Sequence, residues 1–236
     1  NVPAALKICQ PLEPEAELTA VKVNRFIIEA HQLLADHPVN ATRVRDGKLP
    51  ANGLITRGAG SRFELDNALI KQGLKVALVS GCNTVLGLGS IFGFDVITDE
   101  RFTADIDTDL DAKIWAVRKA LNKNDLVYVH IKAPDICSHD RQPLAKRDFL
   151  QRIDQSLKPL LESGATIAVA ADHTTDSNTG SHSADPVPAL IYHPGAGGHA
   201  DPVKFGETSC GGGNMGRLLS KEFLSQVVAT MKSAAV

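Results

Sequence analysis

Residues 166–173 read Thr166-Ile167-Ala168-Val169-Ala170-Ala171-Asp172-His173, and this stretch decides the fold. Its first six positions are apolar or small in succession, which is typical of a buried strand with helices on both faces. The run then ends in an acid and a histidine. Because sites in open parallel sheets form just beyond the carboxyl ends of strands, this one stretch predicts both a strand and a site.

The rest of the chain alternates short strands with helices. Strands are predicted over 74–79, 95–98, 126–131, 166–171 and 187–192, and helices over 19–35, 84–92, 111–121, 146–162 and 215–231. Apolar strands separated by helices of this length favour βαβ units. The expected fold class is therefore α/β, with a mainly parallel sheet and helices on both of its faces.

Composition excludes some classes of partner. The 236 residues carry a formal net charge of -2, without the excess of basic residues that a general nucleic-acid binder needs. No apolar run approaches the roughly 18 residues of a membrane span. The four cysteines are widely spaced and are interpreted as reduced thiols in a cytoplasmic protein. We therefore expect neither a nucleic-acid partner nor a membrane partner.

Three polar clusters fall close to the predicted strand ends. They contain Asp135 with His139, then Asp172 with His173, and finally His182. All five residues are expected on loops at one edge of the sheet, where they can converge. Carboxylate oxygens together with imidazole nitrogens suit Zn or Mn better than Ca. Two such ions can clamp a phosphoryl group, so the clusters predict a metal site for phosphoryl transfer.

Ordinary structural roles compete with this interpretation for each residue taken alone. An Asp-His pair is usually a surface or capping pair, and only the three clusters together favour metal ligation. Cys137 is either a soft ligand or a small loop residue, and the second reading fits better. His193 and His199 lie in a Gly-rich loop and are expected to be exposed. Thr84 opens a helix and could offer a hydroxyl to an anion, but threonine is also an ordinary N-cap.

Several longer motifs follow one another in a set order. They are His37-Pro-Val-Asn40, Pro50-Ala-Asn52, Arg57-Gly-Ala-Gly60, Val129-His-Ile-Lys-Ala-Pro-Asp135 with His139-Asp140, Ala171-Asp-His-Thr174, His182-Ser-Ala-Asp-Pro-Val-Pro188, and Phe205-Gly-Glu207 with Cys210. On these motifs the chain resembles the archaeal-type, 2,3-bisphosphoglycerate-independent (cofactor-independent) phosphoglycerate mutases of the alkaline phosphatase superfamily. It looks like their C-terminal part, which implies an alkaline-phosphatase-like fold.

The resemblance implies metal ligands for two divalent ions, Mn or Zn. Asp135, His139 and His182 are expected to hold one ion. Asp172 and His173 are expected to hold the other.

The resemblance also implies a substrate and a reaction. Arg57 is expected to hold the phosphate or carboxylate of a phosphoglycerate, a task that suits the fork of a guanidinium group. The implied enzyme is an isomerase that interconverts 2-phosphoglycerate and 3-phosphoglycerate in glycolysis and gluconeogenesis. Its substrate is therefore a small phosphorylated molecule.

Three departures from the family pattern matter. In the family, an N-terminal segment supplies an Asp ligand and the Ser that becomes phosphorylated, and a second domain is inserted after it. The nucleophile is therefore expected outside this chain, with residues 1–45 as the tail of the inserted domain and its hinge, and residues 46–236 as the metal-binding domain. Leu86 stands where the family usually has a Lys near the transferred phosphate. Ile136 begins a stretch that replaces the usual acidic residue and Gly.

These departures leave three functions open. The first is the mutase reaction of a longer parent protein. The second is a phosphatase, or a phosphotransferase acting on another small alcohol such as homoserine. The third is a truncated metal-binding module without turnover, in which the site of Asp135, His139 and His182 would keep more metal affinity than the half-site of Asp172 and His173.

Overall fold

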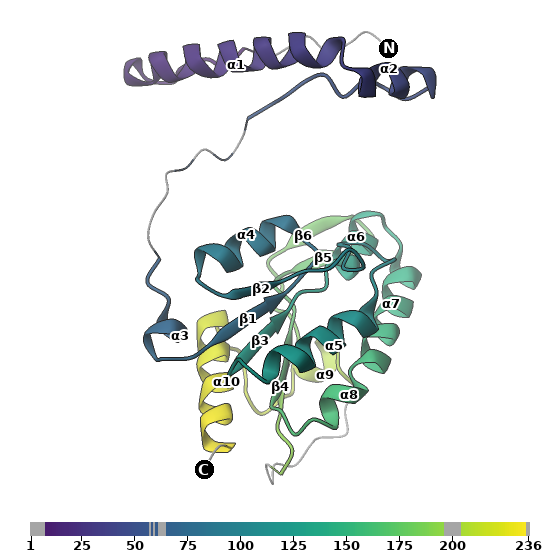
Figure 1. Ribbon diagram of the computed structural model, residues 1–236. Helices are drawn as coiled ribbons and strands as arrows, with labels where there is room; N and C mark the ends of the chain where they lie inside the picture. The colour runs from purple at the N-terminus through teal and green to yellow at the C-terminus, as the bar shows by residue number, and fades with distance from the viewer. Residues whose placement is uncertain (1–7, 57, 59, 61–64, 196–203, 235–236) are drawn as a thin grey trace. The chain divides into compact units, whose positions relative to one another are not determined.

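The chain divides into two compact units in the computed structural model, which describes residues 8–56, 58, 60, 65–195 and 204–234 (Figure 1). The units are Asn1–Phe63 and Glu64–Val236. The division thus falls later than the predicted boundary after residue 45. Asn40 explains part of this difference, because its carboxamide accepts the N–H of Ala51 at 2.7 Å and donates to the Ala51 carbonyl at 3.3 Å. These bonds tie the segment after residue 45 to the helical unit.

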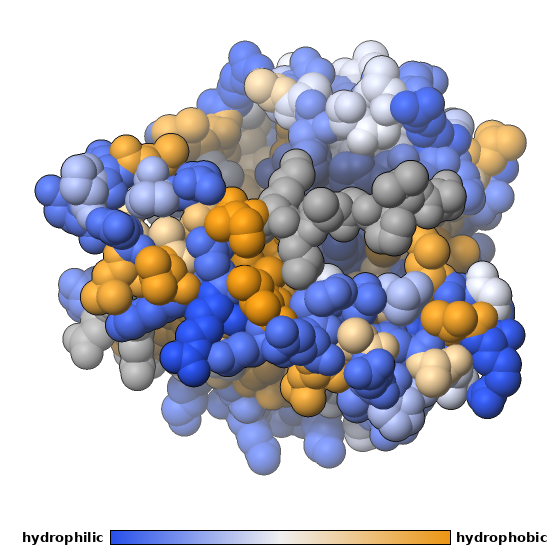
Figure 2. Space-filling view, turned by 90° about the horizontal axis from the view of Figure 1, so that it is seen from above, coloured by the Kyte–Doolittle hydropathy of each residue, from blue (hydrophilic) through white to orange (hydrophobic). Residues whose placement is uncertain are grey.

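The first unit is helical. A 3-10 turn, η1 (Pro14–Ala16), leads into α1 (Glu17–Ala35), and α2 (Pro38–Arg45) follows. Its described residues bury only Ala20 and Ile27 among apolar side chains. Apolar side chains of α1, such as Leu18 and Leu33, remain exposed, and Figure 2 shows apolar residues in orange scattered over the surface seen from above.

The second unit is built on a parallel sheet of three strands. After a short helix, α3 (Ala68–Lys71), the central strand β1 (Val76–Val79) lies between β2 (Asp95–Ile97) and β3 (Leu126–Val129). Leu78 pairs with Val96 on one side and with Tyr128 on the other. The crossovers run through α4 (Asn83–Ile91) and α5 (Leu110–Leu121), which gives the predicted βαβ order.

Helices cover both faces of this sheet, as predicted (Figure 1). On one face, Ile114 and Val117 of α5 pack with Val79 and Phe102 in a buried cluster. On the other face, Val228 of α10 (Ser220–Ala234) packs with Val76. Val76 and Val79 are three positions apart in β1 and thus point to opposite faces, because successive side chains of a strand alternate. The α/β fold class is confirmed.

The chain beyond β3 departs from the predicted pattern. It forms α6 (Ala133–His139), α7 (Pro143–Ser156), α8 (Lys158–Leu161), β4 (Ile167–Ala170), β5 (Thr174–Asp176), β6 (Ser181–Ser183), β7 (Ala189–Tyr192) and α9 (Glu207–Cys210). The helix predicted over 146–162 is two helices. The break precedes Pro159, which lacks the N–H that a continuous helix would use.

The stretch that opened the sequence argument is a strand, but its surroundings differ from the prediction. β4 pairs antiparallel with β7, with Ala168 opposite Ile191. Its side chains alternate between half-buried and exposed, so the prediction that both faces are covered is wrong. The runs of alanine and valine do not distinguish a fully buried strand from one with a single packed face, because small apolar side chains tolerate both. Within the described residues, no helix combines the length and apolarity needed to cross a membrane.

Candidate metal centre

Asp135 and His139 lie on α6 and not on a loop, which corrects the sequence-based prediction. Pro134 in the first turn has its φ preset for a helix, and the acid beside it is favoured by the helix dipole. Residues four apart share a helix face. Accordingly, the His139 Nε2 atom lies 3.4 Å from the Asp135 Oδ1 atom.

A small hairpin of β5 and β6 brings two further histidines to α6. His182 lies on β6 and pairs with Thr175 of β5, and His173 immediately precedes β5. His182 is therefore on a strand, whereas a loop was predicted. Gly180 in the turn has φ +73, and a Cβ added there would lie 2.9 Å from the His139 carbonyl oxygen. This close approach docks the hairpin against the end of α6.

One hydrogen bond across this contact orients His139. Its Nδ1 atom lies 2.8 Å from the Gly180 carbonyl oxygen. A carbonyl oxygen only accepts, so Nδ1 carries the proton. The Nε2 atom of His139 is then left with its lone pair, which is the form a metal ligand needs.

The hairpin and α6 converge on one group of donor atoms. Ligand atoms of Asp135, His173 and His182 lie within 4.8 Å of one another. The Nδ1 atoms of the two histidines are 3.0 Å apart. The ring of His182 also meets the ring of His139 edge-on, with centroids 4.9 Å apart. Four of the five predicted ligands therefore lie together.

The fifth predicted ligand, Asp172, lies at the margin of this group. Its side chain is 81% exposed. One oxygen accepts the backbone N–H of His173 at 3.1 Å, and the other lies 3.4 Å from the His173 Nε2 atom. The structure thus brings His173, which was assigned to the second ion, up to Asp135 and His182 of the first. The division of the ligands between two ions stays a prediction.

Thr175 sits among these ligands and was missed by sequence reasoning. Its hydroxyl lies 2.8 Å from Asp135 Oδ1 and 3.2 Å from the Nδ1 atoms of His173 and His182. The residue is buried. Strand geometry could have predicted its place. Residues two apart in a strand point to the same side, and Thr175 follows His173 by two positions.

Lys132 was also missed. Its ammonium lies 2.7 Å from the Asp135 Oδ2 atom. Burial raises the pKa of Asp135, but hydrogen bonds from Lys132 and Thr175, together with the nearby positive charge, outweigh this and lower the pKa overall. The Asp135 carboxylate is therefore held in the ionised form that binds metal.

Other predicted positions lie elsewhere or outside the described residues. Arg57 and His199 are outside them. Cys137 is buried in α6, where burial raises the pKa of its thiol, and it is no member of the ligand group. His193 is half-buried and bonds to the Thr166 hydroxyl at 2.9 Å, so its predicted exposure is wrong. Thr84 lies in the first turn of α4, whose N-cap is Cys82.

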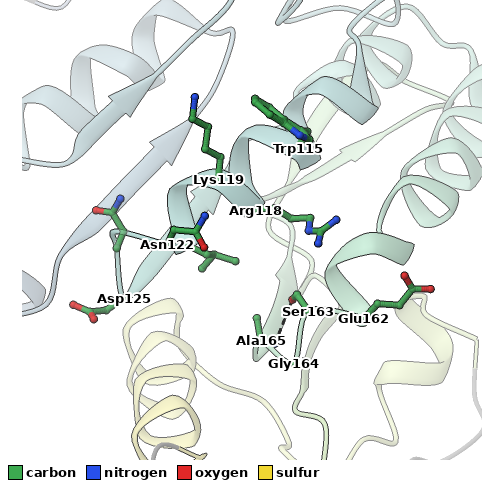
Figure 3. Close-up of a pocket in the computed structure, with 11 residues that line it drawn as sticks. Trp115, Arg118, Lys119, Asn122, Asp125, Glu162, Ser163, Gly164 and Ala165 are labelled. Carbon is green, nitrogen blue, oxygen red and sulfur yellow. Dashed lines mark hydrogen bonds between the residues drawn. The ribbon is translucent and has the colours of Figure 1, made fainter.

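A hollow of the described surface lies at the other end of the strands. It has a volume of about 1050 Å³ and is lined by residues that directly precede β3 and β4, together with the end of α5 (Figure 3). Trp115, Arg118 and Glu162 project around it. None of the predicted ligands lines it.

The sequence pattern of one known family matches residues 33–230. The chain belongs to the metalloenzyme superfamily. The donor group of Asp135, His173 and His182 lies within the matched residues.

Two curated relatives of this chain are archaeal proteins. A 2,3-bisphosphoglycerate-independent phosphoglycerate mutase 1 of Archaeoglobus fulgidus is 38% identical over 193 residues, covering 80% of this chain and 47% of that protein. An enzyme of the same name from Methanoculleus marisnigri is 36% identical over 214 residues, covering 90% and 52%. The chain thus spans about half the length of the curated relatives it matches.

Solved structures agree with this relationship. A protein of Pyrococcus horikoshii superposes with a TM-score of 0.83 at 31% identity, over 93% of this chain and 58% of that one. The cofactor-independent phosphoglycerate mutase of Thermoplasma acidophilum gives a TM-score of 0.53 at 27% identity, over 90% and 51%. The predicted resemblance to the archaeal-type mutases is confirmed.

Proposed function

We propose that the protein to which these residues belong is a metal-dependent phosphoglycerate mutase. It would interconvert 2-phosphoglycerate and 3-phosphoglycerate in glycolysis and gluconeogenesis, in the cytoplasm. The observation that carries the proposal is the convergence of Asp135, His173 and His182, in a chain whose curated relatives are named as such mutases.

The donor set fits divalent metal ions. One carboxylate and two imidazoles, with ligand atoms within 4.8 Å of one another, suit Zn or Mn. Asp135, His139 and His182 would hold one ion, and Asp172 and His173 would contribute to the second. Bound ions of this kind polarise a phosphoryl group and activate an attacking oxygen.

The protein's own side chains prepare this site. Lys132 and Thr175 keep Asp135 ionised through their hydrogen bonds. Gly180 fixes the protonated nitrogen of His139, so the other ring nitrogen faces the ligands. We assign the phosphate or carboxylate of the substrate to Arg57, and the phosphorylated nucleophile to a segment of the longer protein.

The longer protein, loaded with Mn, provides the test. Addition of 2-phosphoglycerate should yield 3-phosphoglycerate, detected by phosphorus NMR. Asp135→Asn should abolish this turnover, whereas Asp154→Asn, which removes an exposed carboxylate of α7, should not. A loaded protein that leaves 2-phosphoglycerate unchanged would contradict the proposal.

Leu86 supports a second candidate. It lies half-buried in α4, at the position where the family resemblance implies a Lys near the transferred phosphate. Without that cation the site could pass the phosphoryl group to water or to another small alcohol such as homoserine. Release of inorganic phosphate, or transfer to an added alcohol, in the same assay would favour this candidate over the mutase.

A further inference from the structure

Two strands of the parallel sheet end in a hydroxyl and an imidazole that touch. Ser80 directly follows β1 and is 0% exposed, and His130 directly follows β3. The Ser80 Oγ atom lies 3.3 Å from the His130 Nδ1 atom. The backbone N–H of His130 donates to the Val79 carbonyl at 2.9 Å, and that of Ser80 donates to the Ile97 carbonyl at 3.2 Å. Both residues are therefore fixed to the sheet.

The bonds around Ser80 determine which nitrogen of His130 carries the proton. The Ser80 hydroxyl oxygen accepts the backbone N–H of Cys82 at 3.0 Å. Its own proton is then free to be donated to the Nδ1 atom of His130. With Nδ1 acting as the acceptor, the neutral ring keeps its proton on Nε2. That N–H lies on the side of the ring away from Ser80.

A rigid support surrounds this pair. A Cβ added at Gly81 would lie 1.8 Å from the Phe102 carbonyl oxygen, so the turn after β1 is pressed against the 102–103 backbone. Lys113 also holds that backbone, because its ammonium donates to the Thr103 carbonyl at 3.1 Å. Lys113 is itself only 1% exposed. A side chain supported in this way keeps its orientation when a ligand arrives.

His130 also lies within electrostatic reach of the metal centre. Burial lowers its pKa, which favours the neutral ring. The carboxylates of Asp172 and Asp135 act in the opposite direction, and the ammonium groups of Lys113 and Lys132 act with burial. These four charges come from the end of β4, from α6 and its N-cap, and from α5. His130 is thus a neutral imidazole placed among the ligands and the cations of the site.

We propose that His130 contacts the substrate, as a neutral imidazole held by Ser80 that donates its Nε2 hydrogen bond to a phosphate oxygen. A neutral donor is suited to this role, because it stabilises developing charge without giving up its proton. The inference rests on the proposed function only in requiring a phosphorylated substrate. Hydrogen bonds to a charged acceptor are among the strong ones, so loss of His130 should weaken phosphate binding about tenfold.

Inorganic phosphate is the probe, and the Zn-loaded protein is the sample, because Zn is diamagnetic. Long-range proton–nitrogen NMR of the imidazoles should show His130 protonated on Nε2, and added phosphate should shift that resonance. Calorimetry should show His130→Phe binding phosphate about tenfold more weakly, with Zn affinity unchanged. Ser80→Ala should shift the tautomer balance of His130 and weaken phosphate binding less.

His193 provides a matched control. It forms the same kind of hydroxyl–imidazole pair, with Thr166 ahead of β4, so His193→Phe should leave phosphate binding unchanged. A His130 resonance that phosphate does not move would overturn the proposal, even if His130→Phe fails to fold. Equal phosphate affinity in His130→Phe and the unaltered protein would overturn it as well. If the mutase assay failed but phosphate still shifted the His130 resonance, the proposed mutase reaction would be rejected and the contact between His130 and phosphate would stand.

Discussion

The surroundings of β3 and β4 differ between the amino ends and the carboxyl ends of the two strands. Before these strands lies the large open hollow around Trp115, Arg118 and Glu162 (Figure 3). Beyond them lie His130 and Asp172, beside the cluster around Asp135. The hollow offers about 1050 Å³ of space but none of the predicted ligands. The carboxyl end offers donor atoms that lie close together and bond to one another. We therefore propose the carboxyl end as the functional end, because sites in open parallel sheets form just beyond the carboxyl ends of the strands.

The largest effect should come from removing the central carboxylate. Asp135→Asn keeps the shape of the side chain but removes the charge that attracts a cation. We expect its Zn affinity, measured by calorimetry, to fall by at least about a hundredfold, the upper range for loss of a supporting contact. Glu162→Gln, the same change at the hollow, should leave Zn affinity unchanged. An Asp135→Asn variant that retains full affinity would break the contrast between the two ends.

A single methyl group should disturb the turn after β1. Gly81→Ala places a Cβ against the Phe102 backbone, which cannot move as a flexible side chain could. Overpacking of this kind should lower the free energy of unfolding by about 2 kcal/mol. Urea unfolding would measure it. Gly87→Ala in α4 meets no atom within 4 Å and should be neutral or stabilising by up to about 1 kcal/mol. Equal unfolding midpoints for the two variants would contradict this packing.

A smaller effect should appear in the pH dependence of stability. Burial lowers the pKa of His130 below its ordinary value of about 6.5. The stability that this ring contributes is therefore present above that value and is lost as the pH falls through the folded pKa. His130→Gln should fall less steeply in stability between about pH 7 and pH 5 than the unaltered protein does.

His193→Gln is the control for that pH series, since His193 bonds to Thr166 ahead of β4, whereas Asp172 follows the end of that strand. Urea unfolding at each pH would give both slopes. Identical slopes for His130→Gln and the unaltered protein would show that folding leaves the pKa of His130 unchanged, which would contradict the prediction.

The smallest effect is expected at the hollow. The Trp115 side chain is 62% exposed, and Lys119 lies over its ring at 5.3 Å from the centroid. Trp115→Ala should change the free energy of unfolding by no more than about 0.5 kcal/mol. It should leave Zn and phosphate affinities unchanged. A clear loss of either affinity would link the two ends of the strands.

Sequence patterns predicted the main helices and strands because the spacing of apolar residues indicates which side of an element is buried. The spacing of Ile114, Val117 and Leu121 identified α5, because this helix packs these residues against the sheet. The run after Leu74 identified β1, because this strand is buried at the centre of the sheet. Short elements left a weaker signal. α6 has only seven residues, and β5 and β6 have three each, so each period repeats too few times to stand out in the sequence.

The sequence identified the predicted ligands by their residue types, but it did not identify the residues that surround and orient them. Asp135 and His173 could be recognised because each is an acid or a base that follows a mainly apolar stretch. Thr175 and Lys132 are common residue types whose roles depend on contacts 40 and 3 residues away along the chain. Gly180 is one glycine among 19, and only its approach to His139 distinguishes it. Such roles arise from tertiary packing, which a single sequence does not display.

The pairing of Thr175 with His182 has a consequence for how the site holds together. Side chains alternate across a strand, so a slip of one residue between β5 and β6 would turn His182 to the opposite side of the hairpin. Each strand has only three residues, and a pair this short gains little from its own ladder. An ion that bonds to His173 and His182 at once would lock the alignment of the two strands, so that the ligand site and the local strand pairing form or fail together.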